Sequence, residues 1–572
     1  MSPIDANALQ PSAGRPLRRP ELGLLLLVFV VVVLAKAWVS DDAYITVRTV
    51  DNFIHGRGLR WNAAERVQAY THPLWMLTLS AVCALTREYY YTTMLLGLAI
   101  SGLAVLLLAS RLAACARGAC LGVAILVASS AFTDFSTSGL ENPLTHLLLA
   151  AFAAVAWGDR PSSHRTFWLC FVAALGMVNR LDSMLLVLPT LVYVCARDRW
   201  PKAAIPVLLG FAPLWLWEGF SLLYYGLLVP NSALAKLNTG IPGTELAAQG
   251  WRYFVKSMQW DPVTLLAIVG GMAVPCVRRD RSAALVGAGI ILHLLYVVRV
   301  GGDFMSGRFF TAPLFMAAIL LARLELRRRL AWTLCVVALA FGGGTRLETR
   351  DRQRTYRQNW KQSIGADGIV DERLFYIHLT ALRSVRGQQR WPQPDAARQA
   401  GYLRLRWYAD PLVADLKRVG LIEPDEAWPP AGKIQPSGTR YNPVVVRGAV
   451  GFLAFYVGPD CYVLDFHALA DPLLARLPMT TSDPVLAALV PKMANRRWRI
   501  GHFCRLIPLG YVETLGTGEN RIRDPSLAAY YDKIALITRG RLLAPGRLAA
   551  IRDLNLHRYD GLLRAYLDRQ RQ

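Results

Sequence analysis

"PLWMLTLSAVCALT", residues 73–86, is the stretch that decides the fold of this chain. It is apolar enough for a membrane helix but shorter than the roughly twenty residues that a perpendicular span needs. Whether it crosses the membrane fixes the side on which every later loop emerges. If it does not cross, each loop on the side of the amino terminus carries basic residues, as cytoplasmic loops do. We therefore predict a juxtamembrane or re-entrant helix here.

The composition places the chain among polytopic membrane proteins. It has 572 residues, of which 54% are hydrophobic and 18% charged, too apolar for an ordinary soluble enzyme. The first apolar run follows a basic leader and has no small-residue cleavage site, which indicates an uncleaved first helix. The other runs predict, with it, about eleven transmembrane helices. The runs lie near 22–39, 93–110, 118–133, 143–157, 166–179, 183–196, 203–224, 262–277, 283–300, 309–322 and 330–344.

The net charge of +24 fits this topology better than it fits a nucleic-acid-binding protein. The basic residues gather in short clusters between apolar runs, which is typical of topology control. They predict a cytoplasmic amino terminus. The clusters are Arg111 and Arg117; Arg160 and Arg165; Arg197, Arg199 and Lys202; Arg278, Arg279 and Arg281; and Arg323, Arg327, Arg328 and Arg329.

The chain divides into a membrane domain, residues 1–344, and a tail, residues 345–572, where the apolar runs stop. Strand-like and helical segments alternate in the tail, which predicts a mixed α/β or α+β globular domain outside the cytoplasm. Its basic character suits an anionic membrane surface or an acidic glycan. Cys461 and Cys504 are either a disulfide of an oxidising compartment or two buried thiols.

The same topology sends the unusual polar loops to the outer face, where we expect the chemistry. They are residues 40–92, 133–143, 179–183, 224–240 and 301–310. In the first of them, Ser40 or Asp41 caps a helix that ends at Gly56. Asp41, Arg48 and Asn52 share a face of this helix, and a carboxylate at a helix start suits a general base. The simpler alternative is that Asp41 and Asp42 only cap the helix.

An ordered set of motifs in this chain resembles the GT-C membrane arabinofuranosyltransferase family, which includes cell-wall and pilin-modifying enzymes. The motifs are "DDAYITVR" (41–48), "HGRGLRWN" (55–62), "TSGLENPL" (137–144), "NRLDS" (179–183), "VPNSALAK" (229–236) and "GGDFMSGRFF" (301–310). Two tail segments, "GPDCYVLDFHALADPLLARLP" (458–478) and "GHFCRLIPLGYVETL" (501–515), look similar to the same group.

The resemblance implies transfer of arabinofuranose from a polyprenyl-phosphate donor to a hydroxyl of a periplasmic glycan or glycoprotein. No nucleotide, metal or other cofactor is implied as obligatory. Asp41 matches the family's catalytic base, with Asp42 as its alternative or partner. The acceptor is left open between a cell-wall arabinan, a lipopolysaccharide or capsule, and a pilin hydroxyl. Whether the reaction inverts or retains the configuration is open as well.

Cations in the outer loops are candidates for holding the donor phosphate, because the charge released on it needs fixed cations in a water-poor site. They are Arg180, Lys236 and Arg308, with Arg48 expected to orient Asp41. The alternative is structural pairing, of Arg180 with Asp182 and of Arg308 with Asp303. The candidates for sugar or acceptor binding are Tyr70, His72, Glu141, Asn142, Asp182, Asn231 and Asp303.

Three other functions compete with this one. The same fold can use another lipid-linked sugar, such as mannose, glucose or aminoarabinose. A transporter of lipid-linked sugars would show repeated halves with broken helices at the midplane, whereas here the polar motifs gather at one face. A non-enzymatic membrane scaffold would tolerate loss of Asp41, Asp42 and Arg308 together.

Overall fold

The structure is a computed structural model that describes residues 15, 17–158, 162–197, 200–358, 364–383, 417–418, 420–422, 425–426, 442–480 and 497–571. Every predicted apolar run forms helix. The helices of the first part are α1 (Arg19–Lys36), α2 (Asp41–Ile54), α3 (Pro73–Thr86), α4 (Tyr90–Leu107), α5 (Ala116–Ala128), α6 (Ser130–Phe135), α7 (Asn142–Ala156), α8 (Ser162–Asn179), α9 (Met184–Arg197), α10 (Trp200–Gly210), α11 (Ala212–Tyr224), α12 (Asn231–Leu237), α13 (Gly243–Trp260), α14 (Pro262–Arg278), α15 (Arg281–Arg299), α16 (Thr311–Ala322) and α17 (Arg328–Gln358).

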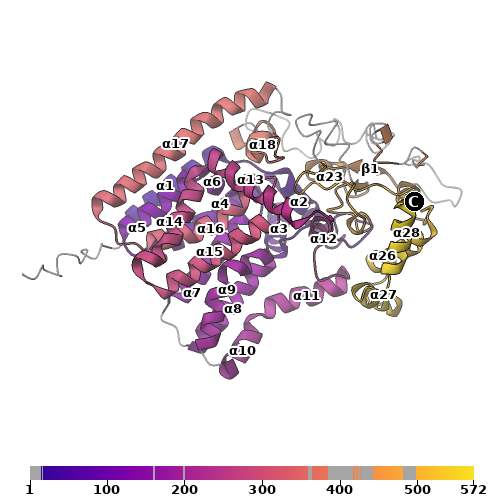
Figure 1. Cartoon of the computed structure of the whole chain (residues 1–572), viewed down its shortest axis with the longest axis horizontal. Helices are drawn as coiled ribbons and strands as arrows, with labels where there is room; N and C mark the ends of the chain where they lie inside the picture. Colours follow the sequence, from indigo (N-terminus) through magenta and orange to yellow (C-terminus); the bar gives the residue numbers. More distant parts are fainter. Residues whose placement is uncertain are drawn as a thin grey trace, which may run out of the picture.

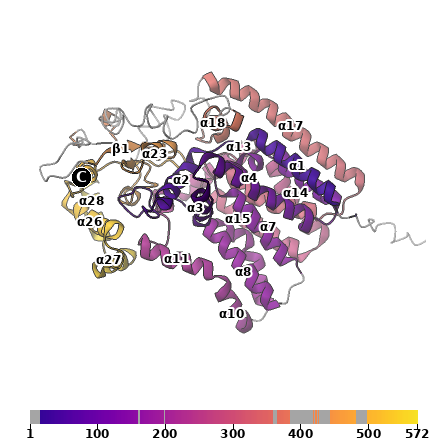
Figure 2. The ribbon, with the colours of Figure 1, turned by 180° about the vertical axis from the view of Figure 1, so that it is seen from behind.

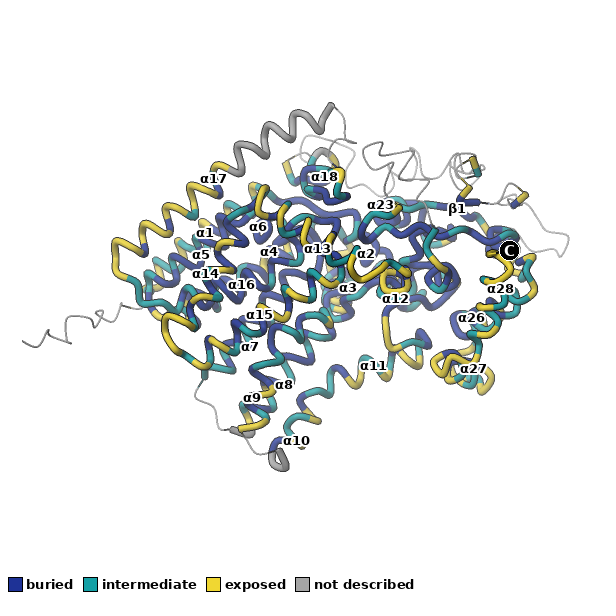
Figure 3. Tube along the Cα trace, in the orientation of Figure 1, coloured by how far each residue is buried: buried dark blue, intermediate teal, exposed yellow. Residues whose placement is uncertain are grey.

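Most of these helices pack into one bundle (Figure 1), whose interior is buried (Figure 3) and apolar. Within it α16 packs against α5 and α14, α4 against α7, and α9 against α15. Short irregular helices, η2 (Leu108–Leu112), η3 (Leu181–Ser183) and η4 (Arg308–Phe310), connect some of the elements. Two of the predicted runs differ from the observed helices. The run at 203–224 is bent by 47° between α10 and α11, where Pro213 cannot donate a helical hydrogen bond. The run at 330–344 is part of a longer helix, α17, which continues beyond residue 344.

The predicted helix at 73–86 has these bounds in the structure. α3 begins at Pro73, because proline fits the first turn of a helix. It ends before Arg87, which adopts a left-handed φ of 55°. The helix packs against α2, α4 and α8. The segment α2 also matches its prediction, and it turns away from α1 by 95°.

The chain is a helical membrane protein. Among the described residues, two helical segments, Tyr90–Leu112 and α15, are long and apolar enough to cross a membrane alone. Three bent pairs, α1 with α2, α10 with α11 and α13 with α14, raise the number to five if each is one span. The figure of about eleven spans therefore stays a prediction.

The tail is built around two short strands with helices beside them. β1 (Val444–Arg447) and β2 (Tyr462–Asp465) pair in parallel, Val444 opposite Tyr462, with α23 (Phe452–Val457) between them in the chain. The other elements are α18 (Glu372–Thr380), η7 (Leu474–Arg476), α25 (Tyr511–Thr517), α26 (Pro525–Arg539), α27 (Pro545–Asn555) and α28 (Asp560–Arg571). The described part of the tail thus contains two short strands and several helices, and the mixed α/β or α+β domain stays a prediction.

The tail packs directly on the first polar loop. Two hydrophobic clusters mix residues of both parts: Tyr44 and Val47 of α2 pack with Phe452 and Tyr456, and Ile45 packs with Val463. Seen from behind, α2 and α3 lie between the bundle and the tail helices (Figure 2). The described part of the tail is therefore held in place by packing against the first polar loop.

Of the two alternatives for Cys461 and Cys504, the structure has the buried thiols and not the disulfide. Side chains of a strand alternate between the two faces of its sheet. Cys461 packs with Val463 on one face, whereas Cys504 packs with Leu464 in the cluster on the other face. The sheet lies between the two sulfurs and keeps them apart.

Candidate active site

Residues from the predicted polar loops meet around the carboxylate of Glu141. This residue precedes the first turn of α7 and has no exposed surface. Its oxygens lie 2.5 Å from Arg180 Nη1, 3.1 Å from Arg308 Nη2 and 3.4 Å from His72 Nδ1. Four loops that are distant in sequence thus share one carboxylate.

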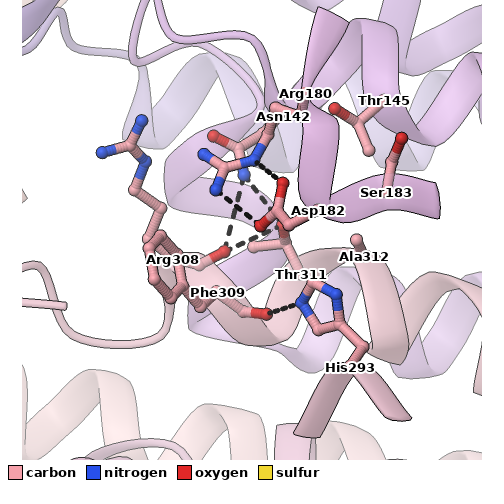
Figure 4. A pocket seen from close by; sticks show the side chains of 10 residues that line it. All are labelled: Asn142, Thr145, Arg180, Asp182, Ser183, His293, Arg308, Phe309, Thr311 and Ala312. Atoms are coloured by element: carbon pink, nitrogen blue, oxygen red, sulfur yellow. Dashed lines mark hydrogen bonds and ion pairs between the residues drawn. The ribbon is translucent and has the colours of Figure 1, made fainter. Parts of the chain in front are cut away.

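Arg180 is held from two sides. Its Nε and Nη2 each donate to Asp182 at 2.7 Å, a paired geometry that fixes the plane of the guanidinium. The same group lies over the ring of Phe309, 5.1 Å from its centre. Figure 4 shows Arg180 and Asp182 facing each other beside Asn142.

Arg308 follows Gly307, whose φ of 78° suits glycine and turns the chain into η4. Besides Glu141, its guanidinium pairs with Asp303 at 3.5 Å. Its Nε is buried and has no hydrogen-bond partner among the described residues. Asn142 anchors this turn by donating to Thr311 at 2.9 Å and to the Arg308 carbonyl at 3.5 Å.

The charges around Glu141 decide its ionisation. Burial by itself raises the pKa of a carboxyl, but the charges of Arg308 and Arg180 hold the pKa of Glu141 well below its usual value. Burial lowers the pKa of His72 to about 4, against the opposing effect of Glu141. His72 is therefore neutral at pH 7, and its Nε2 lies 2.7 Å from the Thr46 hydroxyl.

The adjacent carboxylates Asp41 and Asp42 point to different partners. Asp41 is buried and accepts hydrogen bonds from the backbone N–H groups of Gly451, at 3.2 Å, and Phe452, at 2.8 Å. Burial raises its pKa to about 6 in spite of these bonds. Asp41 therefore fastens α2 to the start of α23.

Asp42 is only partly buried and lies in the field of the guanidinium cluster. Burial raises its pKa, while Arg308 and Lys236 oppose the shift. No hydrogen-bond donor of the described residues is bonded to its carboxylate. Asp42 thus presents an accessible acceptor beside the cations, which Asp41 does not.

The tail adds a second group of polar residues, Glu372, Arg499 and His502, which the sequence analysis did not single out. Glu372 lies close to Asp42, Arg499 and Asp303. Burial and the Asp42 charge raise its pKa well above its usual value. Arg499 lies 3.5 Å from His502 and 5.2 Å from the centre of the Phe304 ring. No spacing in the sequence indicates this group, because its members converge only through folding of the tail.

Backbone pairing holds the tail over this cluster. Val370 N donates to the Phe304 carbonyl at 2.8 Å, and Ser306 N donates to the Val370 carbonyl at 3.0 Å. The loop that carries Asp303 and Arg308 therefore pairs with the tail through a short ladder of backbone hydrogen bonds.

Three predicted site residues have structural partners instead. The guanidinium of Arg48 donates to the carbonyls of Trp61, Ala454 and Cys461 and does not touch Asp41. It shares a helix face with Asp41, as predicted, but that face carries tail contacts. The Tyr70 hydroxyl is bonded to that of Tyr225 at 2.8 Å.

The third, Asn231, donates to the carbonyls of Ala468, Leu469 and Asp471 of the tail. Buried polar groups must find partners, so each of the three is explained by packing. Lys236 differs from them, since it is exposed and lies near Asp42 and His72.

A water-sized cavity of about 20 Å³ lies beneath Arg180 and Arg308, lined also by Asn142, Asp182 and His293 (Figure 4). His293 of α15 is bonded to the Phe309 carbonyl at 3.2 Å. The described residues hold no group of three or more His, Cys, Asp and Glu side chains fit for a metal. The expectation that no cofactor is obligatory stays a prediction.

Fold and site together define a membrane protein with a buried cluster of guanidinium groups and acids, closed over by its own tail, at one end of a helical bundle. Such a cluster suits an anionic ligand and proton transfer beside it. No protein-family model matches the chain, and no solved structure matches it.

Two known proteins do match the sequence. The terminal β-(1→2)-arabinofuranosyltransferase of Mycobacterium tuberculosis is 29% identical over 518 residues, covering 77% of this chain and 79% of that protein. The protein of the same name from Corynebacterium glutamicum is 32% identical over 337 residues, covering 50% of this chain and 47% of that protein. The chain is thus similar to an arabinofuranosyltransferase over most of its length and to a second one over about half of it.

Proposed function

We propose that this protein is a membrane glycosyltransferase that moves D-arabinofuranose from a polyprenyl-phosphate donor to a hydroxyl of a cell-envelope glycan or glycoprotein. Two relatives named as arabinofuranosyltransferases support the reaction. The observation that carries the proposal is the buried cluster around Glu141, where Arg180 and Arg308 have more donors than the carboxylates use.

The cluster faces the periplasm in this proposal, with about eleven spans, a cytoplasmic amino terminus and a periplasmic tail in the bacterial inner membrane. The convergence of the polar loops at one bundle end supports it. The basic loops support it too, since Arg323 lies over the Trp157 ring at 4.2 Å and close to Asp280 and Arg278. Basic loops therefore gather together, as cytoplasmic loops should.

The donor phosphate binds between Arg308 and Lys236, with Arg180 behind them. When the bond between sugar and phosphate breaks, negative charge grows on the phosphate oxygens, and cations already fixed in place stabilise it. Glu141 and Asp182 hold the two guanidinium groups in orientation. This arrangement spares the site any reorganisation during the reaction.

Asp42 acts as the general base that takes the proton from the acceptor hydroxyl. Its carboxylate is accessible and lies beside the cations, whereas both oxygens of Asp41 are occupied by N–H groups of the tail. A base must be ionised, so activity should rise with pH through the raised pKa of Asp42. Asp41 then has a positioning role.

The acceptor enters beneath the tail, where Glu372 and Arg499 lie near Asp42 and His502 lies beside Arg499. Carboxylates and guanidinium groups bind sugar hydroxyls through hydrogen bonds. The tail thereby supplies acceptor recognition and the membrane part supplies donor binding.

The test uses the full chain in lipid nanodiscs with a short-chain polyprenyl-phosphate arabinofuranose and an arabinan acceptor. Asp42→Asn should lower kcat by about 10²-fold or more, since general-base catalysis contributes that much. Asp51→Asn is the matched control on the same helix, where the carboxylate pairs with Arg57 away from the cluster, and it should leave activity unchanged.

Full activity of Asp42→Asn would contradict the assignment of the base. A panel of mannosyl, glucosyl and aminoarabinosyl donors, used with the wild-type chain, tests the sugar. Faster transfer of any of these would replace arabinofuranose in the proposal while leaving the site unchanged.

A further inference from the structure

A second cavity lies at the other end of the bundle, between α1, α5 and α17. Its volume is about 710 Å³. All three helices begin beside it and run toward the opposite end, where Lys36 of α1 pairs with Asp134 in the polar loop 133–143 and Ser129 after α5 is bonded to Thr264. The cavity is therefore separated from the cluster around Glu141 by the length of these helices.

One end of the cavity is basic. Arg15 precedes α1, Arg117 is the second residue of α5, and Arg328 is the first residue of α17. Glu21 is the single acid in the lining and pairs with Arg15. No carboxylate of the described residues pairs with Arg117 or Arg328. The amino termini of three helices also point here, and each adds partial positive charge.

The rest of the cavity is apolar. Its walls are formed by residues such as Leu24, Val28, Val123, Val127 and Leu339. From Arg117 to Val127 the wall extends along ten residues of helix, about 15 Å at the rise of an α-helix. That depth is about half of the ~30 Å hydrocarbon core of a bilayer. The cavity therefore matches one leaflet, with its basic end at the level of the headgroups.

We propose that this cavity binds one anionic phospholipid, with its phosphate at Arg117 and Arg328 and an acyl chain along α5 and α17. Charge complementarity favours an anionic headgroup, because basic pockets between membrane helices attract such lipids. The donor of the transfer reaction is a poor fit, since its phosphate is needed at the opposite end. The lipid fills the space between α1 and α17, beside the part of α5 that lines the cavity.

The experiment uses native mass spectrometry of the full chain released from detergent with dioleoylphosphatidylglycerol or dioleoylphosphatidylcholine. The wild-type protein should retain dioleoylphosphatidylglycerol, which is anionic, and not dioleoylphosphatidylcholine. The double variant Arg117→Ala, Arg328→Ala should lose about tenfold or more of the retained anionic lipid, since each basic residue near a membrane surface contributes about 1 kcal/mol. The control Arg111→Ala, Arg329→Ala removes the same charge from exposed residues outside the cavity lining, and should change retention less than about twofold.

A second pair of variants tests the apolar part without touching charge. Ala124→Trp fills the cavity and should abolish retention of the anionic lipid, whereas Leu103→Trp, on an exposed surface of α4, should not. Equal losses in the cavity variants and their controls would overturn the proposal. Displacement of the lipid by inorganic phosphate or glycerol phosphate would show a simple phosphate site, and displacement by polyprenyl phosphate would assign the cavity to the donor; either result overturns it.

Discussion

Glu141 has no exposed surface and lies between two guanidinium groups and an imidazole. A buried ion pair of this kind adds little net stability, because desolvation offsets the attraction between the charges. The desolvation cost of this ion pair and its geometry are therefore better explained by function, because Glu141 fixes two cations where an anion must bind. Removing the carboxylate leaves both cations buried without their shared partner.

We expect Glu141→Gln to destabilise the protein by about 3–5 kcal/mol, the cost of breaking a buried pair. Thermal unfolding in nanodiscs measures the effect. Glu519→Gln is the control, because its pair with Arg521 is largely exposed, and such pairs contribute at most about 1 kcal/mol. A Glu141→Gln protein as stable as wild type would show that the guanidinium groups do not need the carboxylate.

The ionisation of Asp41 predicts a pH dependence of stability. Its pKa is about 6 in the fold, against an ordinary value of 3.8. Between these values the folded chain binds the proton more tightly than the unfolded chain, so the contribution of Asp41 is complete below pH 4 and lost above pH 6. The advantage of wild type over Asp41→Asn should therefore shrink as pH rises from 4 to 7.

Denaturation of both proteins across this pH range measures that difference. Gly289→Ala provides the comparison, because its added Cβ would meet the backbone of Leu186 in α9, where no titratable group takes part. Its steric effect should be the same at every pH. An advantage of wild type that grows with pH would contradict the raised pKa.

At the scale of elements, glycines set how closely the membrane helices approach. An added Cβ on Gly118 of α5 would lie 2.1 Å from the Ala322 carbonyl oxygen at the end of α16, and one on Gly289 of α15 would lie 2.1 Å from that of Leu186 in α9. Small residues let membrane helices pack backbone to backbone. These contacts hold α9, α15 and α16, whose ends carry the site.

Gly289→Ala should therefore destabilise the protein by about 1–3 kcal/mol through overpacking. Gly102→Ala, in the middle of α4, has no atom within 4 Å of the new methyl group, and should stabilise by about 0.5–1 kcal/mol because alanine favours helix. Thermal unfolding of the two variants side by side checks both signs. A stable Gly289→Ala protein would mean that α9 and α15 can separate without cost.

At the scale of the whole molecule, buried arginines join the tail to the first part of the chain. Arg547 has no exposed surface and donates to the carbonyls of Leu223 and Tyr224 at the end of α11 and to that of Ile537 in α26. Arg505 in the same way joins the tail to Ala235 of α12. The two parts should consequently unfold as one cooperative unit.

Arg547→Ala leaves the carbonyls of Leu223 and Tyr224 without this donor, and we expect a loss of about 1–3 kcal/mol for each carbonyl left unsatisfied. Hydrogen exchange should then speed up both in α26 and in the first loop near Arg66, which donates to the Ile537 carbonyl. Arg564 in α28 pairs with no acid among the described residues, and Arg564→Ala therefore serves as the control. Faster exchange in the tail alone would show that the two parts fold independently.

Much of the fold and part of the site follow from local patterns. Apolar runs predict helices because their burial or membrane insertion does not depend on a particular partner. The loops that hold His72, Glu141, Arg180, Asp182, Asp303 and Arg308 could be assigned to one face from charge alone, and they do meet. The pairing of Arg180 with Asp182 follows from their closeness in sequence, whereas the sharing of Glu141 between both arginines does not.

The sequence by itself determined a helical membrane protein with its polar chemistry gathered at one end, because hydropathy and charge act locally along the chain. Only the tertiary structure decided which of two adjacent carboxylates faces the cations, that Arg48, Tyr70 and Asn231 serve packing, and that Cys461 and Cys504 lie on opposite faces of a sheet. Those outcomes depend on contacts between Asp41 and Gly451 or between Arg48 and Ala454, about four hundred residues apart. Such contacts arise from the packing of the tail, which leaves no periodic signal in the sequence.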